Sequence, residues 1–465
     1  MDFVILTLSV FILVILGYLV FVDTNPNSPP CIRGWIPWFG AAFEFGKAPL
    51  EFIAQARLKY GPVFTVFAAG KRLTFVTLHE DFHTFFMSKD VDFEQAVQEP
   101  VHNTASISKE SFYKFHPACN SLIKGRLTQG NLSLLSSHLC EEFNYNLELL
   151  GSKGSGGLSD LVRSVMYPAV MSNLLGKCNS PSCPATVQEF KDKFRIYDEG
   201  FEYGSQLPDI FLREWAKSKQ WLLSLLDNMI IKAEGSSRST EAGTKTLLQH
   251  LVTTITDKFL PNYGLLMLWA SLANAIPIAF WALAFILSNP SVHRKAVEQI
   301  TEVLKNQDTA QTGVTAAELQ KLSYLKWCIL EAIRLRAPGA ITRRVVRPIK
   351  IQNYTIPPGD LLMISPFWAH RNPKYFPDPE DFKPERWEKA DLVKNVFLEG
   401  FVAFGGGRNQ CPGRWYALME IHMIVTLILY KYELTLLDPL PKPSTLHLVG
   451  TQQPAGPCRV QYKHR

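Results

Sequence analysis

The sequence Phe-Gly-Gly-Gly-Arg-Asn-Gln-Cys-Pro-Gly occupies residues 404–413. The glycines at 405–407 carry no Cβ, so the backbone there can approach a flat ligand closely, and its N–H groups are free to face the sulfur of Cys411. Pro412 favours the first position of a helix, whose dipole stabilises a negative charge at its start. A cysteine in this setting is favoured as a thiolate, which is a metal ligand. The alternative is a glycine turn that enters a helix beside a buried, unreactive cysteine.

The spacing of four residues in this stretch resembles the haem-binding loop of the cytochrome P-450 superfamily: Phe404, Gly407, Cys411 and Gly413. The resemblance implies that Cys411 is the axial ligand of the iron in haem b. It also implies that four neighbours contact the cofactor: Phe404, Gly405, Gly407 and Arg408. One position departs from the family, because the basic residue usual two places before the cysteine is Asn409 here, and Arg408 lies one step earlier. This departure bears on a haem propionate and not on the iron ligand.

Three charged residues upstream form a second point of resemblance. Glu331 and Arg334 are spaced i, i+3 in the predicted helix 317–337, so they share a face. An exposed pair of this kind contributes well under about 1 kcal/mol, which makes a solvated surface the simplest interpretation of the pair alone. In the family, however, the same pair joins an arginine that precedes the cysteine loop, here Arg386. The resemblance implies a buried structural triad that holds the loop in register, which is favourable only if every charge is paired.

Residues 264–288 form an uncharged run long enough to cross a membrane as a helix. Asn274 and Pro277 interrupt the run, and a second crossing would place the two halves of the body on opposite sides of the membrane. We therefore predict a long helix buried through one large domain, since helices that are apolar all round also occur in large cores.

The resemblance places this helix over the haem and exposes a departure from the family. Where the family carries a small residue, Gly, any residue, an acid and Thr, this chain has Ala-Asn-Ala-Ile-Pro at 273–277. Pro277 has no N–H, so the carbonyl of Ala273 loses its helical partner and the helix opens. The freed carbonyl and the Asn274 amide can hold an ordered water that relays protons in place of the missing acid and alcohol. The alternative is that Pro277 only kinks a core helix and Asn274 only fills the gap.

Residues 3–22 are uncharged and apolar, and a membrane-spanning helix needs roughly 20 such residues. A cleaved signal peptide would begin with basic residues, whereas Asp2 is the only charged side chain before this run. The mainly basic charges that follow favour the cytosol for the C-terminal side. Together with the resemblance to microsomal members of the family, this predicts a single-pass protein of the endoplasmic reticulum membrane.

The predicted organisation is mainly helical with small β-sheets, as one large haem domain behind a membrane anchor. The anchor covers residues 1–23, a Pro-rich hinge and membrane-proximal segment covers 24–40, and the catalytic domain covers 41–465. Four segments have the β-rich character of strands: 63–68, 73–77, 345–351 and 360–364. Three segments are predicted as surface loops: 151–157, 179–184 and 235–243.

Other basic residues are assigned by the resemblance alone. Arg343 aligns with the family arginine that reaches a haem propionate, although a solvated strand end explains it equally well. The family's early Trp-x-x-x-Arg pair is missing, and Lys124 and Arg126 are weak substitutes. His370 has no second metal ligand beside it in the sequence, so we interpret it as a structural hydrogen-bonding residue.

Composition sets broad limits on function. The chain has 465 residues, of which 47% are hydrophobic, 12% aromatic and 19% charged, as in a globular protein with an added apolar segment. The net charge of +6 is too small and too dispersed to predict a nucleic-acid partner. Eight cysteines occur without a repeating framework, so neither a disulfide scaffold nor a zinc site is predicted.

The resemblance is closest to the sterol-handling branch of the family, in segments 31–37, 201–208 and 262–266. It implies that the chain hydroxylates an oxysterol, 24-hydroxycholesterol, at the 7α position. Electrons would come from NADPH through NADPH–cytochrome P-450 reductase, whose docking we expect on the thiolate side, near Arg408 and Arg414. Two alternatives remain open. A haem-thiolate isomerase would need no reductase, and a non-catalytic membrane carrier of lipid or haem would consume no cofactor.

Overall fold

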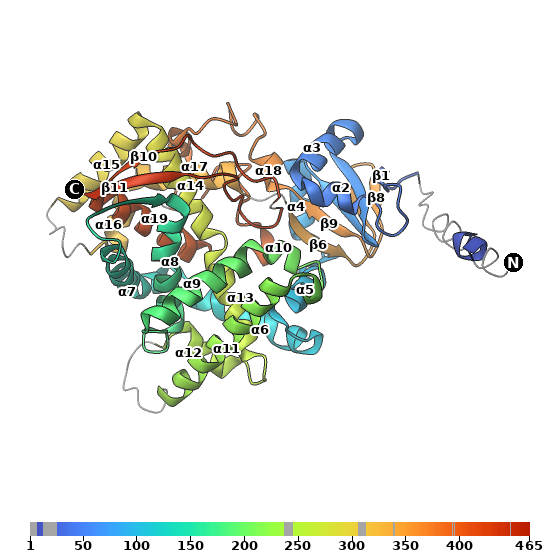
Figure 1. Cartoon of the computed structure of the whole chain (residues 1–465). Helices are drawn as coiled ribbons and strands as arrows, with labels where there is room; N and C mark the ends of the chain where they lie inside the picture. Colours follow the sequence, from blue (N-terminus) through green and yellow to red (C-terminus); the bar gives the residue numbers. More distant parts are fainter. Residues whose placement is uncertain are drawn as a thin grey trace.

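The computed structural model describes residues 7–12, 26–236, 245–305, 313–337, 340–392, 394, 396–446 and 448–465. Figure 1 shows a large helical body with a sheet-rich part at one side, built from N-terminal residues in blue and later residues in orange. The prediction of a mainly helical fold with small sheets is confirmed. Of the predicted anchor the structure describes only residues 7–12, which are helical and exposed; the rest of it lies outside the described residues.

The main sheet has the strand order β1-β2-β3-β9-β6-β4. It contains the predicted hairpin, as β2 (Val63–Ala68) and β3 (Lys71–Val76), beside β9 (Leu361–Ile364) and β6 (Ile341–Val345). Short strands close its edges, β1 (Cys31–Ile32) and β4 (Val91–Asp92). The predicted strand 345–351 is in fact divided between the end of β6 and β7 (Ile349–Ile351), and β7 pairs with β8 (Tyr354–Ile356) in a separate sheet. Because β1 pairs with β2 in parallel, the chain is tied to the body from Cys31 onward.

A third sheet corrects one sequence prediction. The glycine-rich segment 151–157, predicted as a surface loop, contains strand β5 (Lys153–Gly157). β5 pairs with β11 (Arg459–His464), which also pairs with β10 (Tyr432–Leu436). A Cβ on Gly154 would lie 2.4 Å from the Tyr462 hydroxyl, so glycine is needed there because a tyrosine side chain lies across the strand. Gly154 therefore serves strand pairing, whereas Gly151, with a φ angle of 79°, lies before the strand in the turn that follows α7.

The helical body follows the chain in order: α4 (Phe82–Met87), α5 (Phe93–Ala105), α6 (Lys109–Arg126), α7 (Gln129–Glu148), α8 (Leu158–Leu175), α9 (Pro184–Glu199), α10 (Phe201–Gly204), α11 (Arg213–Ser236), α12 (Leu247–Thr254), α13 (Leu260–Leu272), α14 (Ala275–Ser288), α15 (Pro290–Leu304), α16 (Ala316–Lys321), α17 (Ser323–Arg336), α18 (Pro366–Ala369) and α19 (Arg414–Lys431). Before the sheet, α2 (Ala42–Lys47) and α3 (Pro49–Tyr60) cover its N-terminal strands. The predicted loop 179–184 ends at Cys183, because α9 begins at Pro184. Of the predicted loop 235–243, residues 235 and 236 belong to α11, and residues 237–243 lie outside the described residues.

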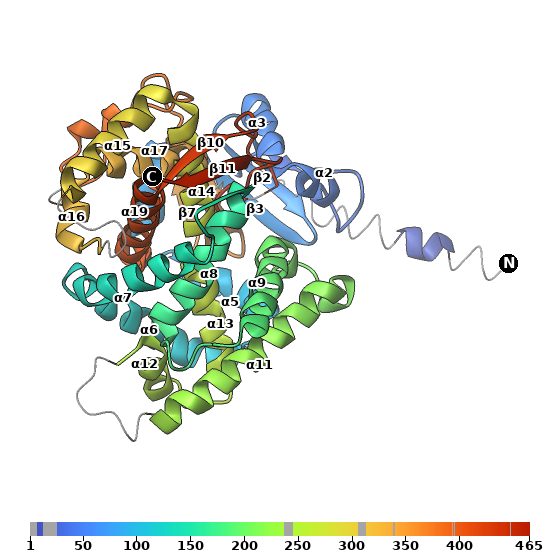
Figure 2. The ribbon, with the colours of Figure 1, turned by 60° about the vertical axis from the view of Figure 1, so that its left-hand side comes forward.

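The core centres on α14, which packs against α8, α17 and α19 (Figure 2). Its residues 275–286 are all buried. Among the described residues one stretch, Leu260–Ser288, is long and apolar enough to span a membrane, and most of it is buried inside the protein. Burial in the core, as predicted, is what the structure shows.

Two predicted helices are in fact divided. The run 264–288 is split into α13 and α14 at Ala273 and Asn274, because Pro277 has no N–H to offer the Ala273 carbonyl. The helix predicted at 317–337 is split at Leu322 into α16 and α17. There the N–H of Tyr324 bonds to the side chain of Gln299 across 3.1 Å instead of to a carbonyl of the preceding turn.

Candidate functional site

The cysteine loop lies between a 3-10 helix, η4 (Pro384–Lys389), and α19. The N–H of Cys411 donates to the Phe404 carbonyl across 2.9 Å and closes the loop. Burial raises the pKa of the Cys411 thiol, while the backbone N–H groups of Gly413 and Arg414 lower it. The Arg414 guanidinium donates to the Cys411 carbonyl across 2.9 Å, which fixes the start of α19 against the loop.

Two details of the loop differ from the sequence prediction. The N–H groups that face the sulfur belong to Gly413 and Arg414, because the start of α19 and not the glycine turn points at the thiol. α19 begins at Arg414 with Gly413 as its N-cap, so Pro412 precedes the helix instead of opening it. The helix dipole still favours negative charge at this sulfur.

The three glycines have different roles. Gly405 and Gly407 have positive φ angles of 68° and 63°, which favour glycine. A Cβ on Gly406 would lie 2.9 Å from the Phe86 ring, and one on Gly407 would lie 2.6 Å from the Phe86 carbonyl. These two glycines let α4 pack onto the loop. At Gly405 the nearest atom is 3.8 Å away, so this residue leaves room for a flat ligand.

Arg343 lies in the middle of β6 and is only 4% exposed, so it is not a solvated strand end. One nitrogen donates to the Thr342 carbonyl at 2.8 Å, and the guanidinium lies over the rings of Phe85 and Phe93. Burial lowers the pKa of Arg343 to about 10; the charge of Asp92 opposes this shift, and the charge of Arg408 adds to it.

Within the described residues, neither Arg343 nor Arg408 forms an ion pair. A buried guanidinium near a second positive charge is costly unless an anion binds between or beside them. The two propionates of haem provide such charges, and the Cys411 thiol provides an iron ligand. The residues present therefore fit haem.

Lys124 and Arg126, the two basic residues at the end of α6, differ in their contacts with the cysteine loop. Lys124 donates to the Arg408 carbonyl across 2.9 Å, so α6 is joined to the cysteine loop through the backbone. Arg126 is exposed. Phe404 is half-buried among aromatic rings, with its centroid 5.9 Å from that of Phe397 and 6.2 Å from that of Phe401.

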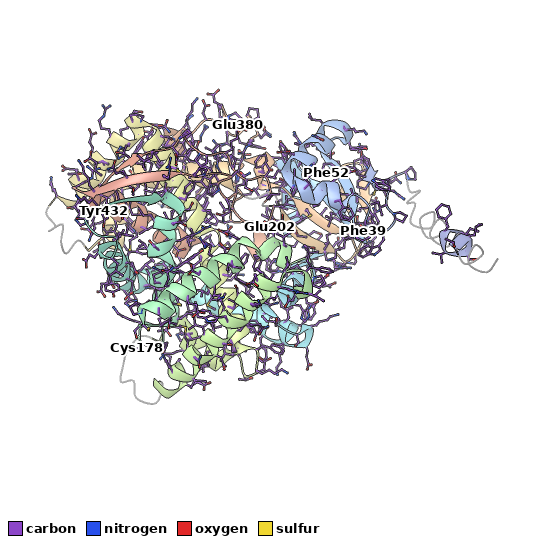
Figure 3. The ribbon with its side chains drawn as sticks, in the orientation of Figure 1. Phe39, Phe52, Cys178, Glu202, Glu380 and Tyr432 are labelled. Atoms are coloured by element: carbon purple, nitrogen blue, oxygen red, sulfur yellow. The ribbon has the colours of Figure 1, made fainter. Side chains whose placement is uncertain are left out.

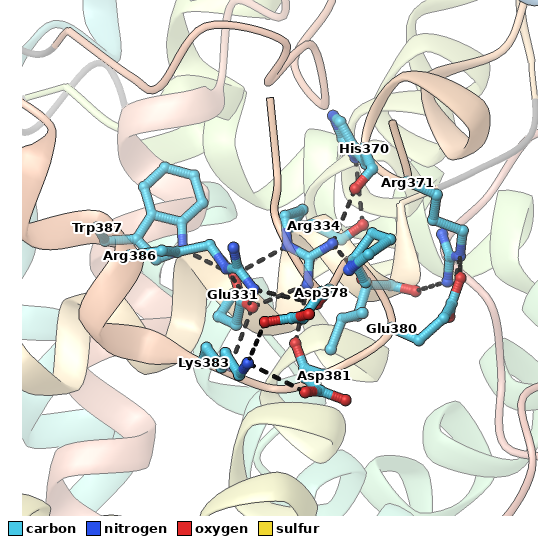
Figure 4. A network of polar contacts seen from close by, with 12 residues as sticks. Glu331, Arg334, His370, Arg371, Asp378, Glu380, Asp381, Lys383, Arg386 and Trp387 are labelled. Atoms are coloured by element: carbon cyan, nitrogen blue, oxygen red, sulfur yellow. Dashed lines mark hydrogen bonds and ion pairs between the residues drawn. The ribbon is translucent and has the colours of Figure 1, made fainter. Parts of the chain in front are cut away.

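The structure brings the three charged residues of the predicted triad together (Figure 4). Glu331 and Arg334 are both 0% exposed, and the side chain of Arg386 is 10% exposed. Arg334 donates to both carboxylate oxygens of Glu331, at 2.9 and 2.8 Å. Arg386 donates to the same carboxylate across 2.9 Å, and the Trp387 indole donates across 3.0 Å.

The rest of the Arg334 guanidinium is also satisfied. It donates to three backbone carbonyls at 2.6–3.1 Å, those of His370, Pro379 and Asp381. Each buried charge therefore has its hydrogen bonds, which is the condition for such a cluster to be stable. Among the described residues, no group of this cluster forms a hydrogen bond or ion pair with the Cys411 side chain; the cluster is linked to the loop at the backbone of Val402.

His370 provides that link. Its ring accepts from the Val402 N–H and bonds to the Arg334 carbonyl, and it stacks on Phe401 with centroids 5.0 Å apart. The Val402 carbonyl in turn accepts from the Gly405 N–H across 2.9 Å. The triad helix and the cysteine loop are joined through one buried histidine.

The central helices carry a partly accessible stripe within an otherwise buried stretch. Ala270 and Asn274 are exposed, and Leu266 and Trp269 are half-buried. Leu266, Ala270 and Asn274 follow the i, i+4 spacing of one helix face, and Trp269 lies beside them at i+3 from Leu266. Oδ1 of Asn274 accepts from both the N–H and the hydroxyl of Thr451, at 3.0 and 3.1 Å.

Sequence reasoning missed two groups near this stripe, Thr451 and Glu202. The Glu202 carboxylate accepts backbone N–H groups from residues 448–450, more than 240 positions away along the chain. No local pattern signals a contact of that kind, because only the tertiary fold brings the two segments together.

The sequence matches a known protein family over most of its length. A family model described as Cytochrome P450 matches residues 29–459. A Mus musculus protein named 24-hydroxycholesterol 7-alpha-hydroxylase is 54% identical over 443 residues, 95% of this chain and 94% of that protein. The Homo sapiens protein of the same name is 52% identical over 468 residues, 98% of this chain and 99% of its own.

A solved structure shows the same fold. It is a cyanobacterial CYP120A1 with bound retinoic acid, and it matches with a TM-score of 0.74 over 94% of this chain and 99% of its own. At 18% sequence identity the match speaks for the fold alone.

Proposed function

The chain belongs to the cytochrome P450 family of monooxygenases, and from this we propose that it hydroxylates an oxysterol, 24-hydroxycholesterol, at the 7α position. The observation that carries the proposal is identity above one half, over nearly the whole length, to two mammalian proteins named for this activity. The resemblance of segments 31–37, 201–208 and 262–266 supports the same substrate.

We propose that Cys411 is the axial ligand of haem b. Phe404 and Gly405 would form the wall on the cysteine side, with Gly405 as the point of close approach, and Gly407 would support the loop from behind, where it packs against Phe86. Arg343 and Arg408 would hold the propionates, since neither forms an ion pair within the described part of the chain. Thiolate-ligated haem supplies reductive cleavage of dioxygen, so that one oxygen atom enters a C–H bond and the other leaves as water.

Ala273, Asn274 and Pro277 are proposed to serve proton delivery. Pro277 leaves the Ala273 carbonyl without a helical donor, and Thr451 occupies Oδ1 of Asn274. The Nδ2 group would donate to an ordered water and the Ala273 carbonyl, which receives no hydrogen bond from Pro277, would accept from it. The role of the chain here is to hold that water and pass its proton.

The triad of Glu331, Arg334 and Arg386 is proposed to be structural. Its charged groups form hydrogen bonds with one another and with backbone carbonyls, so they are not available to bind substrate. The contact with His370 and Val402 supports a role in fixing the cysteine loop.

The membrane assignment is also a proposal. We propose an anchor at 1–23, a membrane-proximal segment at 24–40 and a catalytic domain at 41–465, on the cytosolic face of the endoplasmic reticulum membrane. Large apolar side chains exposed in and beside the middle segment support contact with lipid: Trp35, Trp38, Phe39 and Phe43. Electrons would come from NADPH–cytochrome P-450 reductase, whose docking is proposed near the exposed Arg408.

The test is turnover with purified components. The protein, the reductase and NADPH are incubated with 24-hydroxycholesterol and a panel of other oxysterols, and products are identified by mass spectrometry. A 7α-hydroxylated product that needs both reductase and NADPH supports the proposal. Conversion without them identifies an isomerase, and binding without conversion identifies a carrier.

A further inference from the structure

One carboxylate holds three consecutive backbone N–H groups. Glu202, on α10, lies near the middle of the molecule (Figure 3). Its Oε1 accepts from Leu448 at 3.0 Å, Val449 at 2.9 Å and Gly450 at 3.2 Å, and its Oε2 accepts from Leu448 at 3.1 Å. Hydrogen bonds from backbone N–H groups to an ionised carboxylate are among the stronger ones in proteins. The segment after residue 447 is therefore fastened to α10.

The same segment is fastened to the central helices at its next residue. Thr451 donates its N–H and its hydroxyl to Oδ1 of Asn274. Gln452 continues the attachment, because its N–H donates to the Arg336 carbonyl at 3.2 Å and its carbonyl accepts from the Trp281 indole at 2.7 Å. Residues 448–452 thus join α10 to the point where α13 and α14 separate.

The contacts also fix which way the Asn274 amide faces. A backbone N–H can only donate, so the Asn274 atom opposite the Thr451 N–H is the oxygen and not the nitrogen. Since the amide group is planar with its two polar atoms apart, Nδ2 faces away from Thr451. Asn274 as a residue is exposed, on the same stripe as Ala270.

α10 is itself docked on the stripe. The Phe201 ring stacks on Trp269 with centroids 3.5 Å apart and planes 8° apart. The Ser205 carbonyl, just beyond α10, accepts from Asn103 of α5 across 3.0 Å. Glu202 therefore projects from a fixed support, and movement of residues 448–450 is opposed by a rigid partner.

We propose that Glu202 is a positioning residue for the reaction: it fixes residues 448–450, and through Thr451 it holds Asn274 with its amide nitrogen toward the accessible stripe. This inference rests on the proposed role of Asn274 in proton delivery. Without the carboxylate, three N–H groups lose their acceptor, residues 448–451 loosen, and the Asn274 amide is free to rotate.

The first arm of the test needs no substrate. Hydrogen–deuterium exchange is measured in the haem-loaded wild type, Glu202→Ala and Glu202→Gln. The control is Glu199→Ala, which changes an exposed glutamate three residues earlier in the chain. Glu202→Ala should speed exchange of the amides at 448–451 at least several-fold, and Glu202→Gln should lie between, since one amide oxygen replaces two carboxylate oxygens. The control should match wild type. If the Thr451 amide stays protected in Glu202→Ala, the link to Asn274 does not exist and the proposal fails.

The second arm measures product formed per NADPH consumed. Glu202→Ala should retain the carbon monoxide spectrum of wild type but lower this ratio several-fold and release hydrogen peroxide. In an Asn274→Leu background the same change should lower it no further. An unchanged ratio, or losses that multiply in the double variant, overturns the proposal. Wild type that makes no hydroxylated oxysterol overturns the proposed function instead, and the exchange arm then still decides whether Glu202 holds Thr451.

Discussion

Nε2 of His370 accepts a hydrogen bond from the backbone N–H of Val402 across 2.9 Å. An accepting ring nitrogen carries no proton, so Nδ1 carries it and donates to the Arg334 carbonyl at 3.2 Å. Burial lowers the pKa of His370 to about 3, and the charges of Arg334 and Arg371 act in the same direction. The ring is therefore neutral, and one tautomer joins the triad helix to the cysteine loop.

His370→Phe keeps a ring of similar size but removes both hydrogen bonds. The Val402 N–H and the Arg334 carbonyl would lose their partner in a buried place, which costs about 1–3 kcal/mol for each unsatisfied group. We expect a lower unfolding temperature and faster haem loss at neutral pH.

The pH dependence gives a second readout of His370. Because the folded-state pKa lies below the ordinary value, this group stabilises the fold above about pH 6.5 and loses that contribution as pH falls toward 3. Unfolding temperatures of wild type and His370→Phe should therefore converge on acidification from pH 7 to pH 4. Curves that stay parallel would show that the ring does not titrate as inferred.

Cys411→Ser tests the iron ligand. A serine hydroxyl keeps the size of the side chain but is not a thiolate, so the red-shifted band of the reduced carbon monoxide complex should disappear. Cys458→Ser is the matched control, since Cys458 is buried in the C-terminal sheet region and should leave the band intact. Persistence of the band in Cys411→Ser would exclude this cysteine as the ligand.

Glu331→Ala tests the triad. Removal of the carboxylate leaves Arg334 buried without its anion, and breaking a buried pair of this kind costs roughly 3–5 kcal/mol. We expect little folded, haem-containing protein, measured by absorbance after expression. Glu385→Ala is the control, because Glu385 is half exposed on η4, next to Arg386, and pairs with Lys295. Normal haem content with lost turnover in Glu331→Ala would assign the residue to catalysis.

Asp198→Asn addresses a carboxyl that the proposed reaction does not use. The Trp269 indole donates to it across 3.1 Å, yet burial raises the pKa of Asp198 to about 7, with Arg163 opposing and Glu199 adding to the shift. A raised carboxyl pKa means stability that is full below about pH 4 and is lost as pH rises through about 7. The unfolding temperature of Asp198→Asn relative to wild type should therefore rise between pH 5 and pH 8. A constant difference would contradict the shift.

Asn274→Leu tests proton delivery. Leucine keeps the bulk of the side chain and removes the amide, so the thiolate spectrum and oxysterol binding should persist. NADPH electrons should then be diverted to hydrogen peroxide, and product per NADPH should fall several-fold. Fully coupled turnover in this variant would mean that protons arrive by another route.

The parts of the fold with a local signal were predictable. The hairpin of β2 and β3, the helix after the cysteine loop and the burial of the central apolar run follow from apolar pattern and turn residues. The break between α13 and α14 at Ala273 and Asn274 follows from one proline, Pro277. Family resemblance was needed for the triad, since Glu331 and Arg334 alone look like a surface pair.

The parts without a local signal were not predictable. Gly406 and Gly407 looked like space for a ligand, but Phe86 fills that space from a helix over 300 residues earlier in the chain. Glu202 lies in segment 201–208, which carries a family resemblance, but nothing there signals its acceptor role, because that role is created by backbone N–H groups that any sequence would supply. Such contacts belong to the tertiary fold and leave no trace in spacing or composition.

The pairing of β5 with β11 also bears on how the chain reaches its fold. Residue 153 meets residue 463, so this sheet can close only after nearly the whole chain is available, and pairing over such separations is slow. Before that point β5 has no strand to pair with. Its sequence, Lys-Gly-Ser-Gly-Gly, offers a charge and almost no apolar side chain to another molecule. The glycines of β5, of which Gly154 makes room for Tyr462, thus make the unpaired strand a poor template for aggregation during synthesis.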